Sequence, residues 1–220
     1  RGNADHGNLL VAAGTMLMDR ANSVEVMEYD SSTERLVISE EIEHQFPVER
    51  IIWAPEDSSR RDNISFVTCS DYIRLWRKDA ENARFKLVGI FRPAPGCSGS
   101  GAPCCPYSGV AWCGDRLAAC TRSGLLIVWS ASTLDILRCS DFGSDTLNAM
   151  SLCDVSFVAS DVLAVCNTRG EVILVDLAEE DSVDADVVVQ RPPEEFPEQA
   201  TSFMTTTENG RLGLMMQETG

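Results

Sequence analysis

The sequence predicts an all-β fold of the β-propeller type, in which short antiparallel sheets repeat around an axis. Short apolar segments with strand-like spacing recur at a regular interval along the chain. Tight turns rich in Gly, Ser and Asp separate them. No segment shows the periodicity of an amphipathic helix. Groups of three or four short strands at such an interval are typical of propeller blades.

The repeat is defined by one pattern, with apolar residues at a first position, two residues later and three residues later. Four segments carry it: Val24, Val26, Met27; Ile73, Leu75, Trp76; Leu126, Val128, Trp129; and Val172, Leu174, Val175. Their last members stand at 27, 76, 129 and 175, at intervals of 49, 53 and 46 residues. These intervals slightly exceed the roughly 40 to 45 residues of a WD repeat. We therefore expect residues 22–30, 72–79, 125–130 and 171–176 to be equivalent strands of successive blades.

The other strands of each blade flank these four. The strands expected just before them are rich in small and β-branched residues and end in a tight turn: Leu9–Thr15, Ile64–Ser70, Leu117–Thr121 and Leu163–Asn167. Three further strands come earlier, at Val48–Ala54, Gly109–Cys113 and Cys153–Val158, and charged outer strands follow, as at Arg84–Phe91 and Asp184–Gln190.

Ala200–Thr206 and Arg211–Gln217 are expected to begin a fifth blade. The prediction is thus a single, partial propeller domain over residues 1–220, with about four and a half blades. Surface loops are expected at 93–107 and 179–198. Because natural proteins avoid bare strand edges, we expect these residues to belong to a longer polypeptide.

Several segments resemble a WD-repeat subfamily that includes the plant Transparent Testa Glabra protein and a cullin-associated WD factor of animals. Asn8–Thr15 and Asn22–Asp30 resemble its opening blade. His44–Pro47, Arg50–Pro55 and Thr68–Arg77 are similar to its second blade almost throughout, and Cys105-Pro106 with Val110–Trp112 is similar to the approach to its third. The resemblance covers residues 8–220 and is strongest over 8–80.

The resemblance implies a seven-bladed propeller that binds other proteins. Dual-specificity kinases, transcription-factor complexes and a cullin-RING ubiquitin ligase are the implied clients. The loops Pro93–Pro106 and Glu179–Glu198 depart from the family pattern. Partners that the family binds through those loops are therefore not carried over.

Composition disfavours several other functions. The chain has 18 Lys and Arg residues against 34 Asp and Glu, for a net charge of −16, whereas nucleic-acid binding requires a basic face. The longest apolar run, Leu9–Met18, is much shorter than the roughly 18 residues or more of a membrane-spanning helix. We expect direct contact with neither nucleic acid nor membrane.

The nine cysteines predict structural thiols. Their number is odd, no pair has C-x-x-C spacing, and only His6 and His44 could complete a zinc site. Cys69, Cys120 and Cys166 stand inside apolar strand segments, where a free thiol behaves as a small hydrophobe. We expect no metal or cofactor, and a reducing compartment, cytoplasmic and/or nuclear.

No catalytic constellation is evident. The sequence lacks a phosphate-binding G-x-x-x-x-G-K-[ST] loop, a dinucleotide-binding G-x-G-x-x-G motif and the metalloprotease motif H-E-x-x-H. Asp181, Asp184 and Asp186 lack the Gly and the final Glu of a calcium loop. We therefore expect neither enzyme activity nor a small-molecule substrate.

The residues that stand out are expected to have structural functions. By the resemblance, Asp71 accepts hydrogen bonds from the neighbouring backbone and from a buried histidine, for which His44 is the candidate. Trp76 and Trp129, together with Trp53 and Trp112, are expected to pack between blades. Exposed turn residues Arg122, Ser123 and Arg169 are the candidate partner-binding residues.

The sequence thus predicts a non-catalytic scaffold or adaptor that joins other proteins in a multiprotein complex. One alternative is an architectural subunit of a large assembly. A less favoured one is an enzyme with its site at the propeller channel, which would need inward-pointing acid–base or metal-ligating residues. Fold-level analogy alone does not choose the partner.

Overall fold

The structure is a computed structural model of the 220-residue chain. It describes residues 9–17, 21–55, 64–93, 107–143, 150–178, 200–206 and 212–218, the last two segments by their backbone only. The described part is all-β, with sixteen strands in five antiparallel sheets. No helix able to span a membrane occurs in these segments. The expected outer strand Asp184–Gln190 and the loop 179–198 lie outside the described residues, as does most of the loop 93–107.

The sheets, numbered in chain order, form from strands that follow one another in sequence. Sheet 1 contains β1 (Leu10–Gly14), β2 (Asn22–Asp30) and β3 (Arg35–His44); sheet 2 contains β4 (Arg50–Trp53), β5 (Ser65–Cys69), β6 (Ile73–Lys78) and β7 (Phe85–Phe91); sheet 3 contains β8 (Tyr107–Cys113), β9 (Arg116–Thr121), β10 (Leu125–Ser130) and β11 (Ile136–Asp141); sheet 4 contains β12 (Leu152–Ala159), β13 (Val162–Asn167) and β14 (Val172–Asp176); sheet 5 contains β15 (Ala200–Thr206) and β16 (Leu212–Glu218).

The four strands predicted to be equivalent are β2, β6, β10 and β14, and their positions in the sheets confirm the repeat. In each sheet the last residue of the apolar pattern pairs with the same place on the preceding strand: Val11 with Met27, Phe66 with Trp76, Leu117 with Trp129, and Leu163 with Val175. A β-bulge also recurs opposite this position in the pairs β2–β3, β6–β7 and β10–β11. In all three pairs the extra residue belongs to the outer strand, so the outer strands share this irregularity, which increases local twist.

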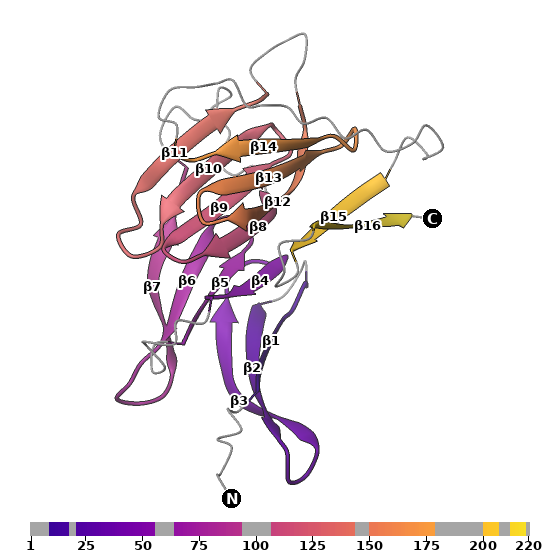
Figure 1. Ribbon diagram of the computed structural model, residues 1–220. Coiled ribbons are helices and arrows are strands. Elements are labelled where there is room, and N and C mark those ends of the chain that lie inside the picture. The colour runs from indigo at the N-terminus through magenta and orange to yellow at the C-terminus, as the bar shows by residue number, and fades with distance from the viewer. Residues whose placement is uncertain are drawn as a thin grey trace, which may run out of the picture.

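Successive sheets lie side by side (Figure 1). The first strands β4, β8, β12 and β15 contact one another in succession, and β1 contacts β4. In Figure 1 the indigo, magenta and orange sheets follow one another in chain order around these strands. This arrangement brings each sheet face to face with the next.

Among the described residues, three apolar clusters each join two neighbouring sheets, and a fourth, around Ala164 and Cys166, lies on the other face of sheet 4. Sheets 1 and 2 bury Val24, Val26 and Ile42 against Phe66, Trp76 and Phe85; sheets 2 and 3 bury Val67, Ile73 and Leu75 against Leu117, Ile127 and Trp129; sheets 3 and 4 bury Cys120, Leu126 and Val128 against Leu152, Val165 and Ile173. Side chains alternate between the faces of a strand, so the adjacent Phe66 and Val67 serve different clusters. Each inner sheet is therefore apolar on both faces.

Candidate functional site

The first strands of sheets 2, 3 and 4 begin at one common end of the molecule. Arg50, at the start of β4, donates from Nη2 to the Ser108 carbonyl at 2.7 Å and pairs through Nη1 with Asp154 at 3.4 Å. The Ser108 hydroxyl donates to the carbonyl of Leu152 at 2.7 Å. These contacts tie the starts of β4, β8 and β12 together across three sheets.

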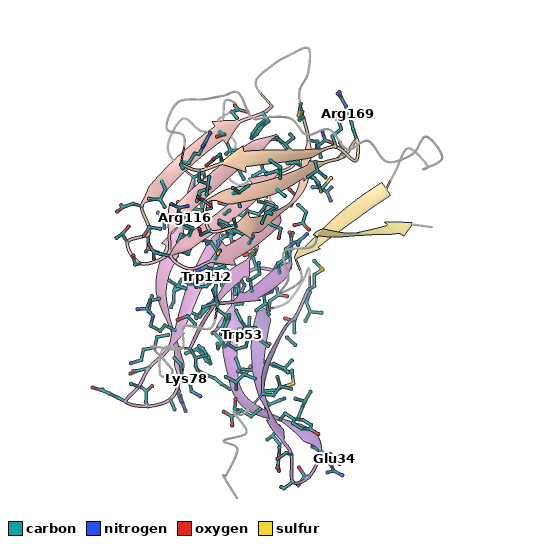
Figure 2. All side chains as sticks on the ribbon, in the orientation of Figure 1. Glu34, Trp53, Lys78, Trp112, Arg116 and Arg169 are labelled. Carbon is teal, nitrogen blue, oxygen red and sulfur yellow. The ribbon has the colours of Figure 1, made fainter. Side chains whose placement is uncertain are left out.

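The turns between the second and third strands of these sheets lie at the same end, because the strands are antiparallel. They are residues 70–72, 122–124 and 168–171. We call this end of the molecule, with the ends of β3 and β7, the hairpin face. In Figure 2 Arg169 marks the turn of the β13–β14 hairpin, whereas Arg116 lies at the other end of its sheet.

Two of the turns are fixed by buried polar side chains. Thr121 Oγ1 accepts from the Leu125 amide at 3.1 Å, and Asn167 Oδ1 accepts from the amides of Arg169 and Glu171, both at 3.0 Å. Gly124 and Gly170 supply φ angles of 92° and 75°, in the region that favours glycine. These residues hold the turns without the exposed side chains of Arg122 and Arg169.

The predicted partner-binding residues stand on these two turns. Arg122 and Ser123 are exposed at the β9–β10 turn, and Arg169 is exposed at the β13–β14 turn. The Ser123 hydroxyl lies 2.8 Å from Thr121 Oγ1, so it also contributes to the turn. Arg122 and Arg169 extend from neighbouring sheets on the hairpin face.

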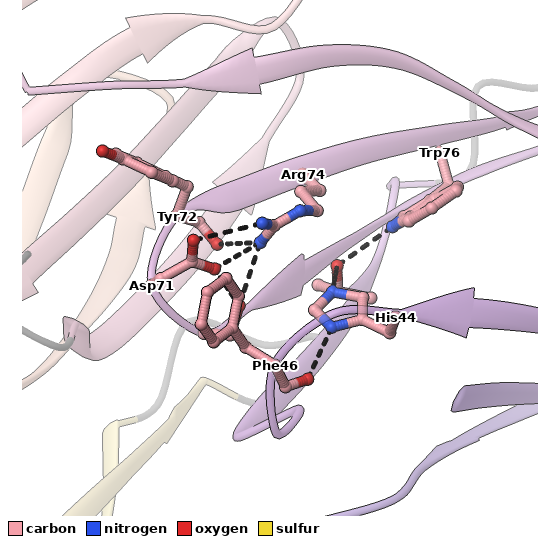
Figure 3. A network of polar contacts seen from close by, with 8 residues as sticks. His44, Phe46, Asp71, Tyr72, Arg74 and Trp76 are labelled. Carbon is pink, nitrogen blue, oxygen red and sulfur yellow. Dashed lines mark hydrogen bonds and ion pairs between the residues drawn. The ribbon is translucent and has the colours of Figure 1, made fainter. Parts of the chain in front are cut away.

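Below the β5–β6 turn, a buried polar chain links His44 to Trp76 (Figure 3). His44 Nδ1 lies 2.7 Å from the Phe46 carbonyl, which can only accept, so this nitrogen carries the proton. Nε2 then accepts from the Thr68 hydroxyl at 3.1 Å, and Trp76 Nε1 donates to the same hydroxyl oxygen at 2.9 Å. Burial is the main cause that lowers the pKa of His44, and it favours the neutral ring. Each of these side-chain polar atoms therefore has a hydrogen-bond partner.

The hydrogen-bond donors to Asp71 differ from the expected one. It was expected to accept a hydrogen bond from His44, but its carboxylate accepts from Arg74 Nη1 at 2.6 Å and from the Ser70 hydroxyl at 2.6 Å. Burial opposes ionisation of Asp71, but the hydrogen bonds from Arg74 and Ser70 outweigh it and lower its pKa. Arg74, three residues further along the chain, engages the carboxylate, and His44 turns to the Phe46 carbonyl instead.

Two buried tryptophans, Trp76 and Trp129, occupy the equivalent repeat position but donate to different acceptors. Trp76 is 7% exposed and reaches Thr68 on the neighbouring strand. Trp129 is fully buried, and its Nε1 donates to the Arg92 carbonyl of sheet 2 at 3.2 Å. Sheet 3 has Ala119 at the place equivalent to Thr68, so no hydroxyl is available there. Trp53 and Trp112 are only half-buried at the ends of β4 and β8.

Two arginine–aromatic contacts on the hairpin face were not among the residues predicted from the sequence. The Arg74 guanidinium lies 6.0 Å from the centre of the Phe46 ring, and that of Arg92 lies 5.6 Å from the centre of the Tyr72 ring. Such distances are typical of cation–π interactions. The sequence signal was available, because Tyr72 directly follows the predicted turn Ser70-Asp71 and Arg92 directly follows the predicted outer strand Arg84–Phe91.

The buried thiols are weak nucleophiles in this environment. Burial raises the pKa of both Cys69 and Cys120 to about 12, so they are protonated near neutral pH. No group of three or more His, Cys, Asp or Glu side chains suited to a metal ion occurs within the described segments. What the site offers is a rigid face of exposed polar, aromatic and cationic side chains.

Comparison with known proteins places the fold. No family model matches the chain. Over 80 residues it is 29% identical to the DDB1- and CUL4-associated factor 7 homolog of Dictyostelium discoideum, a stretch that is 36% of this chain and 24% of that protein. The match therefore spans about a quarter of the relative's length.

Solved structures with low sequence identity share the architecture. The C-terminal WD40 domain of Sif2 superposes with a TM-score of 0.50 at 15% identity, covering 80% of this chain and 48% of that one. The computationally designed Ika8 protein superposes with a TM-score of 0.51 at 12% identity, covering 90% of this chain and 54% of that one. The chain spans about half of either structure. Together with the repeated sheets, these likenesses show that the chain has the fold of a WD-repeat β-propeller.

Proposed function

We propose that this chain is a non-catalytic WD-repeat adaptor that binds other proteins through its hairpin face. The observation that carries the proposal is the construction of the β9–β10 and β13–β14 turns. Thr121 and Asn167 fix the backbone, and Arg122 and Arg169 remain exposed on a rigid support. Exposed loop residues held in place by a rigid scaffold are a common arrangement for recognition.

The proposed clients are inferred from the similarity of this chain to known proteins. The Dictyostelium relative is described by its name as associated with DDB1 and CUL4. A cullin-RING ubiquitin ligase is therefore one proposed setting for this chain, and the subfamily resemblance adds dual-specificity kinases and transcription-factor complexes. The proposed compartment is the cytoplasm or nucleus, because the buried cysteines Cys69, Cys120 and Cys166 are free thiols.

Affinity purification followed by mass spectrometry tests the proposal. An adaptor is expected to recover kinases, transcription factors or ligase subunits in substoichiometric amounts. Recovery of a fixed, stoichiometric set of subunits would instead favour an architectural subunit. Substitution of Arg122, Ser123 or Arg169 should weaken recovery without unfolding the protein, because exposed turn positions usually change stability by less than about 0.5 kcal/mol. Gly170 is unsuitable for such a test because its φ is 75°.

A second measurement addresses catalysis. The proposal is contradicted if the purified chain turns over a small-molecule substrate and a point substitution abolishes turnover while the protein remains folded. Recovery of no partner under any condition would also contradict the adaptor role.

A further inference from the structure

The hairpin face carries three exposed arginines for which the described segments provide no acidic partner. Arg92, Arg122 and Arg169 form no ion pair with any residue in the described segments. Arg74, by contrast, is held by Asp71, and Lys78 and Lys86 pair with Glu28 and Asp79. Arginines without a paired carboxylate among the described residues are unexpected in a chain whose acidic residues outnumber its basic ones by 34 to 18.

The side chains of Arg122 and Arg169 are not required to hold the turns that carry them. The β9–β10 turn is held by Thr121 and Gly124, and the β13–β14 turn by Asn167 and Gly170. Arg169 contributes only its backbone amide, which donates to Asn167 Oδ1 at 3.0 Å. The guanidinium groups of Arg122 and Arg169 are therefore available to a ligand, whereas that of Arg92 already lies over the Tyr72 ring.

Charge differs between the two ends of the strands. The turns at the end opposite the hairpin face are rich in carboxylates: Asp30, Glu34, Asp79, Glu81, Asp115, Asp135 and Asp161. Figure 2 shows Glu34 at the tip of the β2–β3 hairpin, at this opposite end. The hairpin face also carries the carboxylates Glu49, Asp71, Asp141 and Glu171. Asp71 is held by Arg74, and Glu171 accepts a hydrogen bond from Asn167. An anionic segment is therefore expected to be attracted only where Arg92, Arg122 and Arg169 stand.

Aromatic rings lie among the cations. Phe46 is 38% exposed beside Arg74, and Tyr72 lies under the guanidinium of Arg92. Arginine and aromatic residues are the types enriched at the energetic centres of protein interfaces. The rings offer an apolar contact next to charged groups that favour carboxylates.

We propose that the hairpin face binds an extended acidic segment of a partner protein, with an aromatic or long apolar side chain placed against Phe46 and Tyr72. Its carboxylates pair with Arg92, Arg122 and Arg169 across sheets 2, 3 and 4. This inference rests on the proposed adaptor function and specifies the chemistry of the partner. The overall acidity of the chain favours a short acidic peptide over a long polyanion, whose outlying charges would be repelled.

Fluorescence anisotropy with a defined probe tests the inference. The probe is a fluorescein-labelled peptide of alternating Glu and Asp residues with a central Phe. It should bind the intact chain, and binding should weaken as salt screens the charges. The double variant Arg122→Glu, Arg169→Glu should raise Kd by about tenfold or more, because it replaces two attractive contacts with repulsive ones. Phe46→Ala should weaken binding of this probe more than that of a probe with Ala in place of Phe.

The matched control is Arg35→Glu, Arg84→Glu, which changes the net charge equally at exposed positions on the opposite end of the strands. It should change Kd by less than about twofold, since these charges lie far from the probe. Thermal unfolding checks that both variants are folded.

Four results would overturn the inference. They are the absence of saturable probe binding, an equal loss in the control variant, equal binding of a probe with Gln and Asn in place of Glu and Asp, and tighter binding of an oligothymidine. A separate measurement tests the adaptor role, namely the recovery of partner proteins by the wild type and by the arginine double variant. Equal recovery contradicts this surface alone, whereas recovery of nothing by the wild type contradicts the adaptor role.

Discussion

At the scale of single residues, the buried polar groups show how one repeat position is adapted in each sheet. Trp76 and Trp129 occupy the same register, yet one donates to a threonine hydroxyl and the other to a backbone carbonyl. The indole N–H needs an acceptor when buried. Trp76 finds it in its own sheet, whereas Trp129 finds it at the end of the neighbouring sheet 2. The apolar contact is thus shared by the repeats, and the hydrogen bond is specific to each.

Trp76→Ala is expected to lower the free energy of unfolding by about 3–5 kcal/mol, the usual cost of removing a buried large aromatic side chain. The ring is 7% exposed and stacks on Phe66 at a centroid distance of 6.4 Å. Urea denaturation measures the loss. Leu137→Ala is the control, because Leu137 is 54% exposed and its loss should cost less than about 0.5 kcal/mol. A cost below about 1 kcal/mol for Trp76 would contradict its burial.

His44 should make stability depend on pH. Burial lowers its pKa in the folded protein below the 6.5 of the unfolded chain, so the unfolded state binds the proton more readily. This contribution is complete above pH 6.5 and is lost as pH falls from there toward the folded pKa. Urea midpoints measured between about pH 5 and pH 7.5 should therefore fall on acidification.

The variant His44→Gln should flatten that dependence, and His6→Gln is the control for the second histidine of the chain. If both variants keep the pH dependence of the wild type, the inference that His44 is buried in its neutral form is wrong. If only His6→Gln removes the slope, the titrating group has been misassigned.

At the scale of elements, the turns of the hairpin face are defined by glycine and by buried oxygen acceptors. Gly124 packs closely as well as adopting a positive φ. A Cβ atom there would lie 2.5 Å from the Gly143 nitrogen and 2.6 Å from the Met150 carbonyl oxygen. The β9–β10 turn is thus pressed against the segment that leads into sheet 4.

Gly124→Ala should destabilise the protein more than Gly114→Ala, because both positions have positive φ but only Gly124 is crowded. Gly114 has a φ of 54°, and a Cβ atom added there would meet no other atom within 4 Å, so alanine should cost about 1–2 kcal/mol from conformation alone. Gly124→Ala should add a backbone clash and cost roughly 1–3 kcal/mol more. Thermal or urea unfolding ranks the two variants. Equal costs would show that the turn moves away from Gly143.

The strands were largely predictable, whereas the polar contacts between them were not. Period-two alternation and the recurrent apolar triplet determined the positions of β2, β6, β10 and β14, because a shift of one residue would turn every side chain to the wrong face. The partner of Asp71 was predicted wrongly, because Arg74 competes for the carboxylate and the outcome depends on three-dimensional reach. Phe46, Tyr72 and Arg92 were missed because their contacts, Phe46 with Arg74 and Tyr72 with Arg92, form between the ends of different strands.

At the scale of the whole molecule, the sheets are joined by apolar faces and by a polar link at their inner edge. Arg50 reaches from sheet 2 to Ser108 in sheet 3 and Asp154 in sheet 4. The Asp154 side chain is 5% exposed, so its charge depends on such partners. This link spans three sheets, whereas each of the three apolar clusters between sheets joins only two.

Arg50→Met is therefore expected to loosen the inner edge of sheets 3 and 4 more than that of sheet 1. The substitution keeps the apolar stem but removes the donors to the Ser108 carbonyl and to the buried Asp154 carboxylate. Because the Arg50 side chain is 30% exposed, the cost should be about 1–3 kcal/mol, below that of a fully buried pair. Hydrogen exchange should quicken at the starts of β8 and β12 and remain unchanged in β2.

Lys78→Met is the control, because the Lys78–Glu28 pair at 3.8 Å is partly exposed and should contribute less than about 0.5 kcal/mol. Faster exchange spread evenly over all sheets would mean that Arg50 acts on global stability, and the local link between the three first strands would be wrong.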